Sequence, residues 1–148
     1  MRTLITATAA SVLALSGCSM LGLGAVNVEE LQVSVGECVI EPTVAQEGEG
    51  EVGALDTVDC AQPHHGEVYS THELTDESYP ADIDTQADAV CYDSFEAYVG
   101  VPYDESRYYY SVTYPSPETW DAGDRQVACF VVGEEGEELT GSVQGASA

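Results

Sequence analysis

The sequence predicts one α+β domain: a mostly antiparallel sheet with one main helix packed on a face, held by two disulfides. Short segments rich in β-branched and aromatic residues recur between turn residues, which is typical of strands. One longer segment repeats apolar residues at helical spacing. The length of 148 residues allows a single domain, and four of the five cysteines lie beyond the N-terminal region.

The first residues predict an export signal of the lipoprotein type. Arg2 precedes an apolar run from Leu4 to Leu15, and small residues then lead to Cys18. This run is shorter than a membrane-spanning helix requires. We therefore expect residues 1–17 to be a signal peptide, and Cys18 to carry acyl chains such as palmitate that anchor the protein outside the cytoplasm on the cell membrane. The alternative is an ordinary secretory signal with a coincidental cysteine.

The rest of the chain divides into a tether, a domain and a tail. Residues 18–32 contain Gly22 and Gly24 and lack residues that fix a turn, so they predict a flexible tether. Residues 33–143 are the predicted α+β domain, which is long enough to bury one core. Residues 144–148 are mostly small, and we expect this tail to fray.

Several segments of the domain are predicted to be strands. Residues 126–132 (QVACFVV) are apolar on both faces, which indicates an interior strand. Residues 139–143 are expected to return as a short last strand. The predicted strands, in order, are residues 33–40, 54–60, 67–74, 107–114, 126–132 and 139–143.

Two helices are predicted between these strands. In residues 84–99 an apolar stripe recurs at helical spacing; Asp82 or Asp84 could cap its start, and Gly100 ends it. A short second helix begins after Ser116 with Pro117 in its first position. The apolar stripe of the first helix comprises Ala87, Val90, Cys91, Phe95 and Tyr98.

The four later cysteines permit three disulfide pairings. We expect Cys38–Cys60 and Cys91–Cys129, because pairs that are near in sequence close the shorter loops. The second bridge would join the predicted helix to the sheet. A zinc site at these cysteines is the alternative, but no C-x-x-C spacing is present.

The charge of the chain excludes one large class of function. Lys and Arg number 3 against 27 Asp and Glu, which gives a formal net charge of −24. Such a surface repels phosphate backbones, so we expect no nucleic-acid binding, and it also opposes docking on anionic lipids or wall polymers. Two acidic clusters, one of Glu47, Glu49 and Glu51 and one in residues 134–138, lack the spacing of a calcium loop, and no cofactor is expected.

The three histidines are the first candidate site. His64, His65 and Glu67 lie close in sequence, and His72 follows. Imidazole and carboxylate groups are common metal ligands, yet adjacent histidines usually point apart. The structural interpretation is a histidine that satisfies backbone groups in a turn. Catalysis would require a nucleophile beside the base, and Ser70 does not lie in a G-x-S-x-G motif.

The tyrosines are the second candidate site. Tyr108, Tyr110 and Tyr114 share one face of a predicted strand, and Tyr109 lies on the other. Exposed, these side chains and Trp120 would form a binding surface; buried, they would belong to the core. Arg125, after Trp120, is expected to form a fixed ion pair if it is partly buried, and the structural interpretation of this segment is a corner with a packed Trp120.

The order of these features resembles the septum formation domain family, over residues 33–143. Val35-Gly36-Glu37-Cys38 resembles its opening V-G-[DE]-C, and residues 58–68 resemble its V-x-C-x-x-P-H-x-x-E-V. Residues 120–129 resemble the W-x-x-G-x-R-x-x-x-C of its closing P-x-x-x-W-x-x-G-x-R-x-x-x-C, and Pro117 precedes Trp120 by one residue fewer than that pattern. His64 and Glu67 fall on positions of that motif, whereas His65 does not. The resemblance implies a bacterial envelope protein linked to cell division, and it implies no defined catalytic mechanism.

Together these observations predict a lipid-anchored, extracytoplasmic binding domain of the cell envelope. We expect it to be non-enzymatic, to bind another envelope protein, and to act in septum formation or cell-wall assembly. The first alternative is a lipoprotein that binds a metal or small solute through His64, Glu67 and His72. The second is a cell-wall hydrolase.

Overall fold

A five-stranded antiparallel sheet organises the protein. The computed structural model describes residues 27–40 and 55–148, and the strands follow the order β2-β1-β3-β5-β4. The central β3 pairs with β5 along seven residue pairs, interrupted by one irregularity between Val68 and Ser70. The strands are β1 (Cys38–Val39), β2 (Thr57–Val58), β3 (Gly66–Glu73), β4 (Tyr109–Thr113) and β5 (Gln126–Val132).

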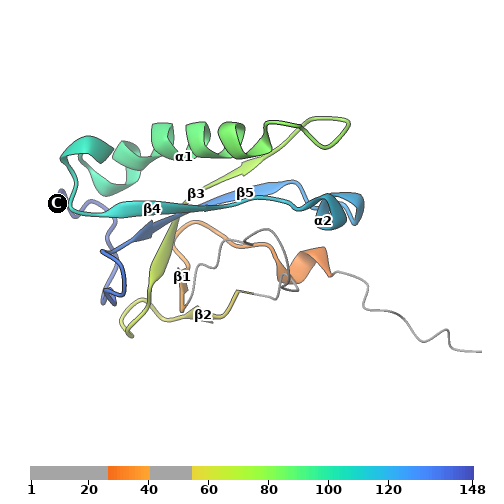
Figure 1. Ribbon diagram of the computed structural model, residues 1–148. Coiled ribbons are helices and arrows are strands. Elements are labelled where there is room, and N and C mark those ends of the chain that lie inside the picture. Colours follow the sequence, from red (N-terminus) through yellow and green to blue (C-terminus); the bar gives the residue numbers. More distant parts are fainter. Residues whose placement is uncertain (1–26, 41–54) are drawn as a thin grey trace, which may run out of the picture.

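Helix α1 (Ile83–Val99) covers one face of this sheet, as Figure 1 shows. Its predicted stripe faces β3, β4 and β5, and Ala87, Cys91 and Phe95 are fully buried there. Gly100 ends the helix in the left-handed region at φ 95°, which glycine adopts without strain. Asp82 occupies the first cap position, but its side chain does not cap; it accepts a hydrogen bond from the Gln86 side chain instead.

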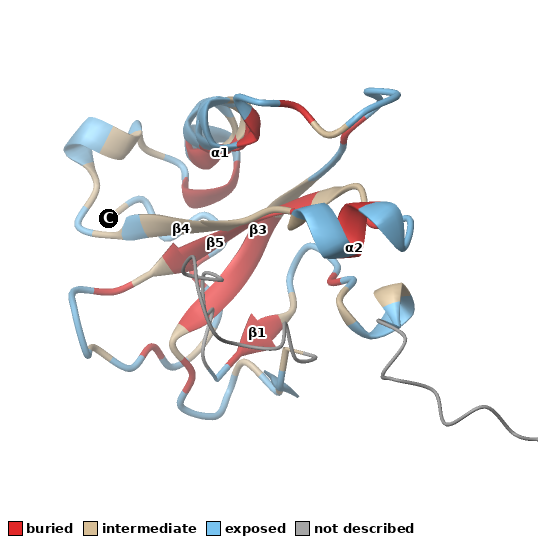
Figure 2. Ribbon diagram, turned by 45° about the vertical axis from the view of Figure 1, so that its right-hand side comes forward, coloured by how far each residue is buried: buried red, intermediate tan, exposed pale blue. Residues whose placement is uncertain are grey.

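The opposite face of the sheet has a smaller core. Val39, Val68 and Phe130 are buried there, with Val33 from the segment that precedes β1. The Gln126 side chain fixes that segment by hydrogen bonds with both the N–H and the C=O of Val33. Residues 28–30, in the expected tether, form the 3-10 helix η1 (Val28–Glu30). Figure 2 shows β3 and β5 buried between the two layers.

Both predicted disulfides are confirmed. Cys38 is bonded to Cys60, and Cys91 is bonded to Cys129. Cys91, Cys129 and Cys38 are fully buried, while Cys60 is half-buried. The second bridge joins α1 to β5 through the middle of the larger core, so the helix is covalently fixed to the sheet.

The short second helix is also confirmed. Helix α2 (Pro117–Asp121) begins with a capping box, in which Ser116 Oγ accepts from the N–H of Thr119 and the Thr119 hydroxyl group accepts from the N–H of Ser116. Residues 103–105 form another 3-10 helix, η2 (Tyr103–Glu105). No helix in residues 27–40 and 55–148 is long and apolar enough to cross a membrane.

The C-terminal segment differs from the prediction. Residues 139–143 do not form a strand; Leu139 makes a single bridge with His64 and the chain then leaves the sheet. The tail that was expected to fray is hydrogen-bonded to the end of α1, where Gly145 N–H donates to Tyr98 and Ser147 N–H donates to Val99. The tail stays ordered because its N–H groups bond to carbonyl oxygens of α1 and do not need water as a partner. Cys18 and the acidic residues Glu47, Glu49 and Glu51 lie outside the described residues.

Candidate functional site

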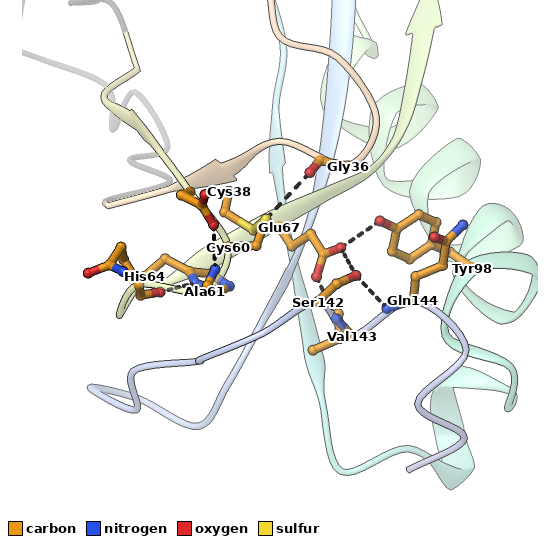
Figure 3. Close-up of a disulfide and its surroundings, with 12 residues drawn as sticks. Gly36, Cys38, Cys60, Ala61, His64, Glu67, Tyr98, Ser142, Val143 and Gln144 are labelled. Atoms are coloured by element: carbon orange, nitrogen blue, oxygen red, sulfur yellow. Dashed lines mark hydrogen bonds between the residues drawn. A yellow bond between two sulfur atoms is a disulfide. The ribbon is translucent and has the colours of Figure 1, made fainter.

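The Pro-His and Glu positions of the sequence motif lie inside the domain. His64 ends the turn that leads into β3, and its main chain pairs with Leu139. Glu67 lies within β3, between Cys38 of β1 and Val131 of β5. Both side chains are 0% exposed, beside the Cys38–Cys60 disulfide (Figure 3).

Three donors surround the Glu67 carboxylate. The Tyr98 hydroxyl group donates to one oxygen at 2.6 Å, and the Ser142 hydroxyl group donates to the same oxygen at 2.5 Å. The Val143 N–H donates to the other oxygen at 2.6 Å. Burial of a carboxylate is costly unless hydrogen bonds replace its water, and these three bonds supply that replacement. Glu67 therefore joins the sheet, α1 and the C-terminal segment at one point.

Sequence reasoning missed this connection, although one signal could have revealed it. Tyr98 lies on the apolar stripe of α1, and a buried tyrosine hydroxyl group requires a hydrogen-bond partner. Burial raises the pKa of Tyr98, and its hydrogen bond to Glu67 raises that pKa further. Ser142 and Val143 belong to a segment that was predicted as a strand, so their contact with Glu67 was not foreseen.

The histidines do not gather into one site. His65 Nδ1 contacts the carbonyl oxygen of Ile40, and His72 is exposed on β3 opposite Val127. His64 Nδ1 contacts the carbonyl oxygen of Gln62 at 2.9 Å, while Nε2 has no partner among the described residues. The alternative metal-ligand set of His64, His65 and His72 is therefore not brought together.

A different trio does lie close together. One ligand atom each from Cys38, His64 and Glu67 fall within 4.8 Å of one another. Cys38, however, is bonded to Cys60, and the two Glu67 oxygens accept three hydrogen bonds. With the disulfide formed, His64 Nε2 is the one uncommitted ligand atom of this trio. These residues do not fit a metal ion in the oxidised protein.

The structure divides the predicted tyrosine surface between core and solvent. Tyr108, Tyr110 and Tyr114 lie on the α1 side of β4 and pack against the larger core. Tyr109 points to the opposite side and is 49% exposed. Period-two alternation along one strand explains this division.

An aromatic cluster, which sequence reasoning did not foresee, lies beside β4. Tyr103 of η2 stacks edge-on against Tyr110 at a centroid distance of 4.8 Å and against Phe95 at 5.2 Å. Tyr92 of α1, which is 44% exposed, extends the cluster at 5.8 Å from Tyr103. Edge-to-face contacts of this kind stabilise aromatic pairs beyond their buried area.

Carboxylates accept hydrogen bonds from the hydroxyl groups of two of these tyrosines. The Tyr110 hydroxyl group donates to Asp88 at 2.7 Å, and the Tyr92 hydroxyl group donates to Asp104 at 3.1 Å. Burial raises the pKa of Tyr110, and its bond to Asp88 adds to this effect. The bond to Asp104 is the main reason that the pKa of Tyr92 is raised. We call Tyr92, Tyr103, Tyr110, Asp88 and Asp104 the aromatic–acidic surface, which lies on the α1 side of β4.

Trp120 belongs to the core instead of the predicted binding surface. Its side chain is buried, and the Arg125 guanidinium group stacks over the ring at 3.6 Å. Arg125 also donates to the carbonyl oxygens of Trp120 and Asp124. The predicted ion pair of Arg125 is thus replaced by a cation–π contact. In the part of the chain that the structure describes, the recorded ion pair joins Arg107 to Glu137 at 2.7 Å.

Comparison with known proteins decides the family. A family model described as Septum formation matches residues 35–148. This chain belongs to the septum formation family. No curated protein and no solved structure matches it. The match confirms the resemblance seen in the motifs, and membership relates the chain to septum formation.

The septum formation match covers every element of the site described above. It includes both disulfides, Glu67 and the C-terminal segment that donates to it. It also extends to the last residue, consistent with a tail that is hydrogen-bonded to α1. In this septum formation domain, the His and Glu positions of the motif hold the C-terminal segment, His64 through its main chain and Glu67 through its carboxylate.

Proposed function

We propose that this protein is a lipid-anchored, extracytoplasmic domain that binds another envelope protein during septum formation or cell-wall assembly. The observation that carries the proposal is the aromatic–acidic surface beside β4. Exposed tyrosines are common at binding surfaces, because a rigid aromatic ring contributes a large contact area at a small entropic cost. Tyr92 of this surface is exposed, and Tyr103 and Tyr110 beside it are held in place by packing and a hydrogen bond. Tyr109 is exposed on the other side of β4.

Binding explains the chain better than catalysis does. The motif residues that could carry out acid–base chemistry, His64 and Glu67, are fully buried. Both oxygens of Glu67 accept hydrogen bonds that hold the C-terminal segment and α1. A general base must reach its substrate or a water molecule in contact with it. These two side chains therefore act on the fold rather than on a substrate.

Two features support a location outside the cytoplasm. The lipoprotein-type sequence around Cys18 provides an acylation site. The two disulfides, three of whose four cysteines are fully buried, are stable in an oxidising compartment. An acyl chain at Cys18 would keep the domain within one short tether of the membrane surface.

Replacement of the proposed acylated cysteine tests the anchor. In Cys18→Ser, we expect the precursor to remain unprocessed or the domain to be released from membranes, because no thiol remains to be acylated. Membrane and soluble fractions of cells that express each form are compared by immunoblot, and mass spectrometry gives the mature N-terminus. If the variant sediments with membranes and matures at the same residue as the wild type, Cys18 is not the anchor.

Cross-linking on intact cells tests the binding function. The full-length protein is cross-linked, purified by affinity, and its partners are identified by mass spectrometry. The expected result is a reproducible septum or wall-assembly protein, recovered less from cells with Cys18→Ser because the variant is not held at the membrane. Recovery of the protein without any partner would contradict the proposal, as would turnover of a wall substrate by the purified protein.

A further inference from the structure

Within residues 27–40 and 55–148, the outer edge of β4 is unpaired. There β4 is the last strand of the sheet and pairs with β5 alone. The other edge strand, β2, has two residues, whereas β4 has five. Natural proteins protect such edges with lysine, proline or a bulge. β4 contains none of these, and Pro115 lies beyond its end.

The hydrogen-bond pattern shows which main-chain groups face outward. The Val68 N–H donates to Glu37 at 2.8 Å and the Val68 C=O accepts from Gly36 at 2.7 Å, so both point away from β5. Phe130, which lies opposite Val68, must then direct its N–H and C=O toward β4, to Ser111. Because these directions alternate along a strand, the main-chain groups of Tyr110 and Val112 point off the sheet.

Among the described residues, these outward groups have no partner strand. Tyr108, the residue before β4, has its N–H bonded to the Ser106 hydroxyl group. The next outward positions are Tyr110 and Val112, and their side chains are held against the larger core. Figure 2 shows β4 mostly half-buried beside the buried β5. A strand added at this edge could form main-chain hydrogen bonds with Tyr110 and Val112, which are both held in place by their side chains.

Acidic groups flank this edge on both sides. On the α1 side, Asp88 is bonded to the Tyr110 hydroxyl group. At the start of β4, a hollow of about 470 Å³ opens beside Tyr109. Arg107 in its wall is paired with Glu137, and among the described residues Glu134 and Glu135 have no ion-pair partner. The lining residues are Arg107, Tyr109, Glu134, Glu135, Gly136 and Glu137.

We propose that β4 accepts an extended, basic segment of the partner protein as a sixth strand. Main-chain bonds to Tyr110 and Val112 supply affinity, and a Lys or Arg side chain enters the acidic hollow beside Tyr109. A second copy of this chain is disfavoured at this edge, because each copy has a formal charge of −24. This inference rests on the proposed binding function and specifies the surface and the chemistry of the partner.

Photo-cross-linking from single positions tests the edge. A benzophenone amino acid replaces Tyr109 in the full-length protein on intact cells. The same amino acid at Val35, which is 51% exposed and lies in the segment before β1, is the matched position. We expect position 109 to capture one envelope protein through a basic segment, and position 35 to capture much less of it.

Two pairs of variants test the mechanism. Val112→Pro removes an outward N–H, and Val112→Ala controls for the lost side chain; we expect about fivefold less capture with proline than with alanine, the effect of about one lost hydrogen bond. Glu134→Gln with Glu135→Gln should lower capture, whereas Glu29→Gln with Glu30→Gln removes the same charge from η1 and should not. The glutamine pairs keep the test valid if Val112→Pro fails to fold.

Several outcomes would overturn the inference. They are equal capture by Val112→Pro and Val112→Ala at equal folded amounts, equal capture from positions 35 and 109, capture of a second copy of this chain, or capture of a segment without basic residues. If chemical cross-linking recovers an envelope partner but position 109 does not, the edge proposal fails and the binding function stands. If neither recovers a partner, both fail.

Discussion

At the scale of the residue, Glu67 shows how a motif position can serve the fold. The sequence singled out Glu67 beside a histidine, which suggested metal binding. The structure instead places it at a junction of three segments, where Tyr98, Ser142 and Val143 donate to it. Spacing along the chain could not reveal this, because two of the donors lie more than 70 residues away.

Substitution of this carboxylate should release the C-terminal segment. We expect Glu67→Gln to lower the free energy of unfolding by about 1–3 kcal/mol, because the amide group cannot accept all three hydrogen bonds. Glu73→Gln, on the exposed end of the same strand, should change it by less than about 0.5 kcal/mol. Urea unfolding gives both values. Hydrogen exchange at Val143 and Gly145 should accelerate in Glu67→Gln alone, and unchanged protection there would refute the junction.

The buried tyrosines predict a loss of stability in alkali. Burial is the leading cause of the raised pKa values of Tyr69, Tyr98 and Tyr110. In the unfolded chain these phenols ionise near pH 10, while in the folded chain they stay protonated to higher pH. The unfolded state therefore binds fewer protons above pH 10, so stability should be constant below that pH and fall above it.

Phenolate absorbance and tryptophan fluorescence, recorded together, test this prediction. Tyr69, Tyr98 and Tyr110 should ionise only over the pH range in which the fluorescence of Trp120 shows that the protein unfolds. Complete ionisation near pH 10 with unchanged fluorescence would contradict the assigned burial.

At the scale of the element, segments with a clear apolar pattern were predicted well, and the two strands nearest the N-terminus were not. The helix predicted over residues 84–99 and the strand over 126–132 match α1 and β5 closely, because packing on one or both faces imposes a clear pattern. The strands predicted over 33–40 and 54–60 shrink to two residues each in β1 and β2. Their extent is set by pairing with neighbours, which local composition does not encode.

The two disulfides should differ in how readily a reductant reaches them and in how much each contributes to the free energy of unfolding. Cys60 is half-buried, whereas Cys91 and Cys129 are fully buried, so mild reductant should open Cys38–Cys60 first. Replacement of both cysteines by alanine should cost about 3 kcal/mol for Cys38–Cys60 and about 4 kcal/mol for Cys91–Cys129, whose loop is longer. Mass spectrometry of alkylated samples gives the order, and urea unfolding gives the costs. Simultaneous reduction of both bridges would contradict the burial.

At the scale of the whole molecule, the net charge bears on the class of partner we expect, and the tertiary fold decides where a binding surface can form. The net charge of −24 was evident from composition, and from it we expect no nucleic-acid partner. Composition could not tell where an aromatic surface would form, because that depends on η2 folding back against α1 and β4. The sequence therefore predicted tyrosines as candidates, and tertiary contacts decided which ones face solvent.

The central claim is that the buried motif maintains the fold while the surface beside β4 performs the binding. The most direct measurement compares Glu67→Gln with Tyr109→Ser for partner capture per folded molecule on intact cells. We expect Tyr109→Ser to lose capture with little change in thermal stability, and Glu67→Gln to lose stability while each folded molecule captures as well as the wild type. Normal capture by Tyr109→Ser, together with lost capture by folded Glu67→Gln, would contradict this claim and return the function to the buried motif.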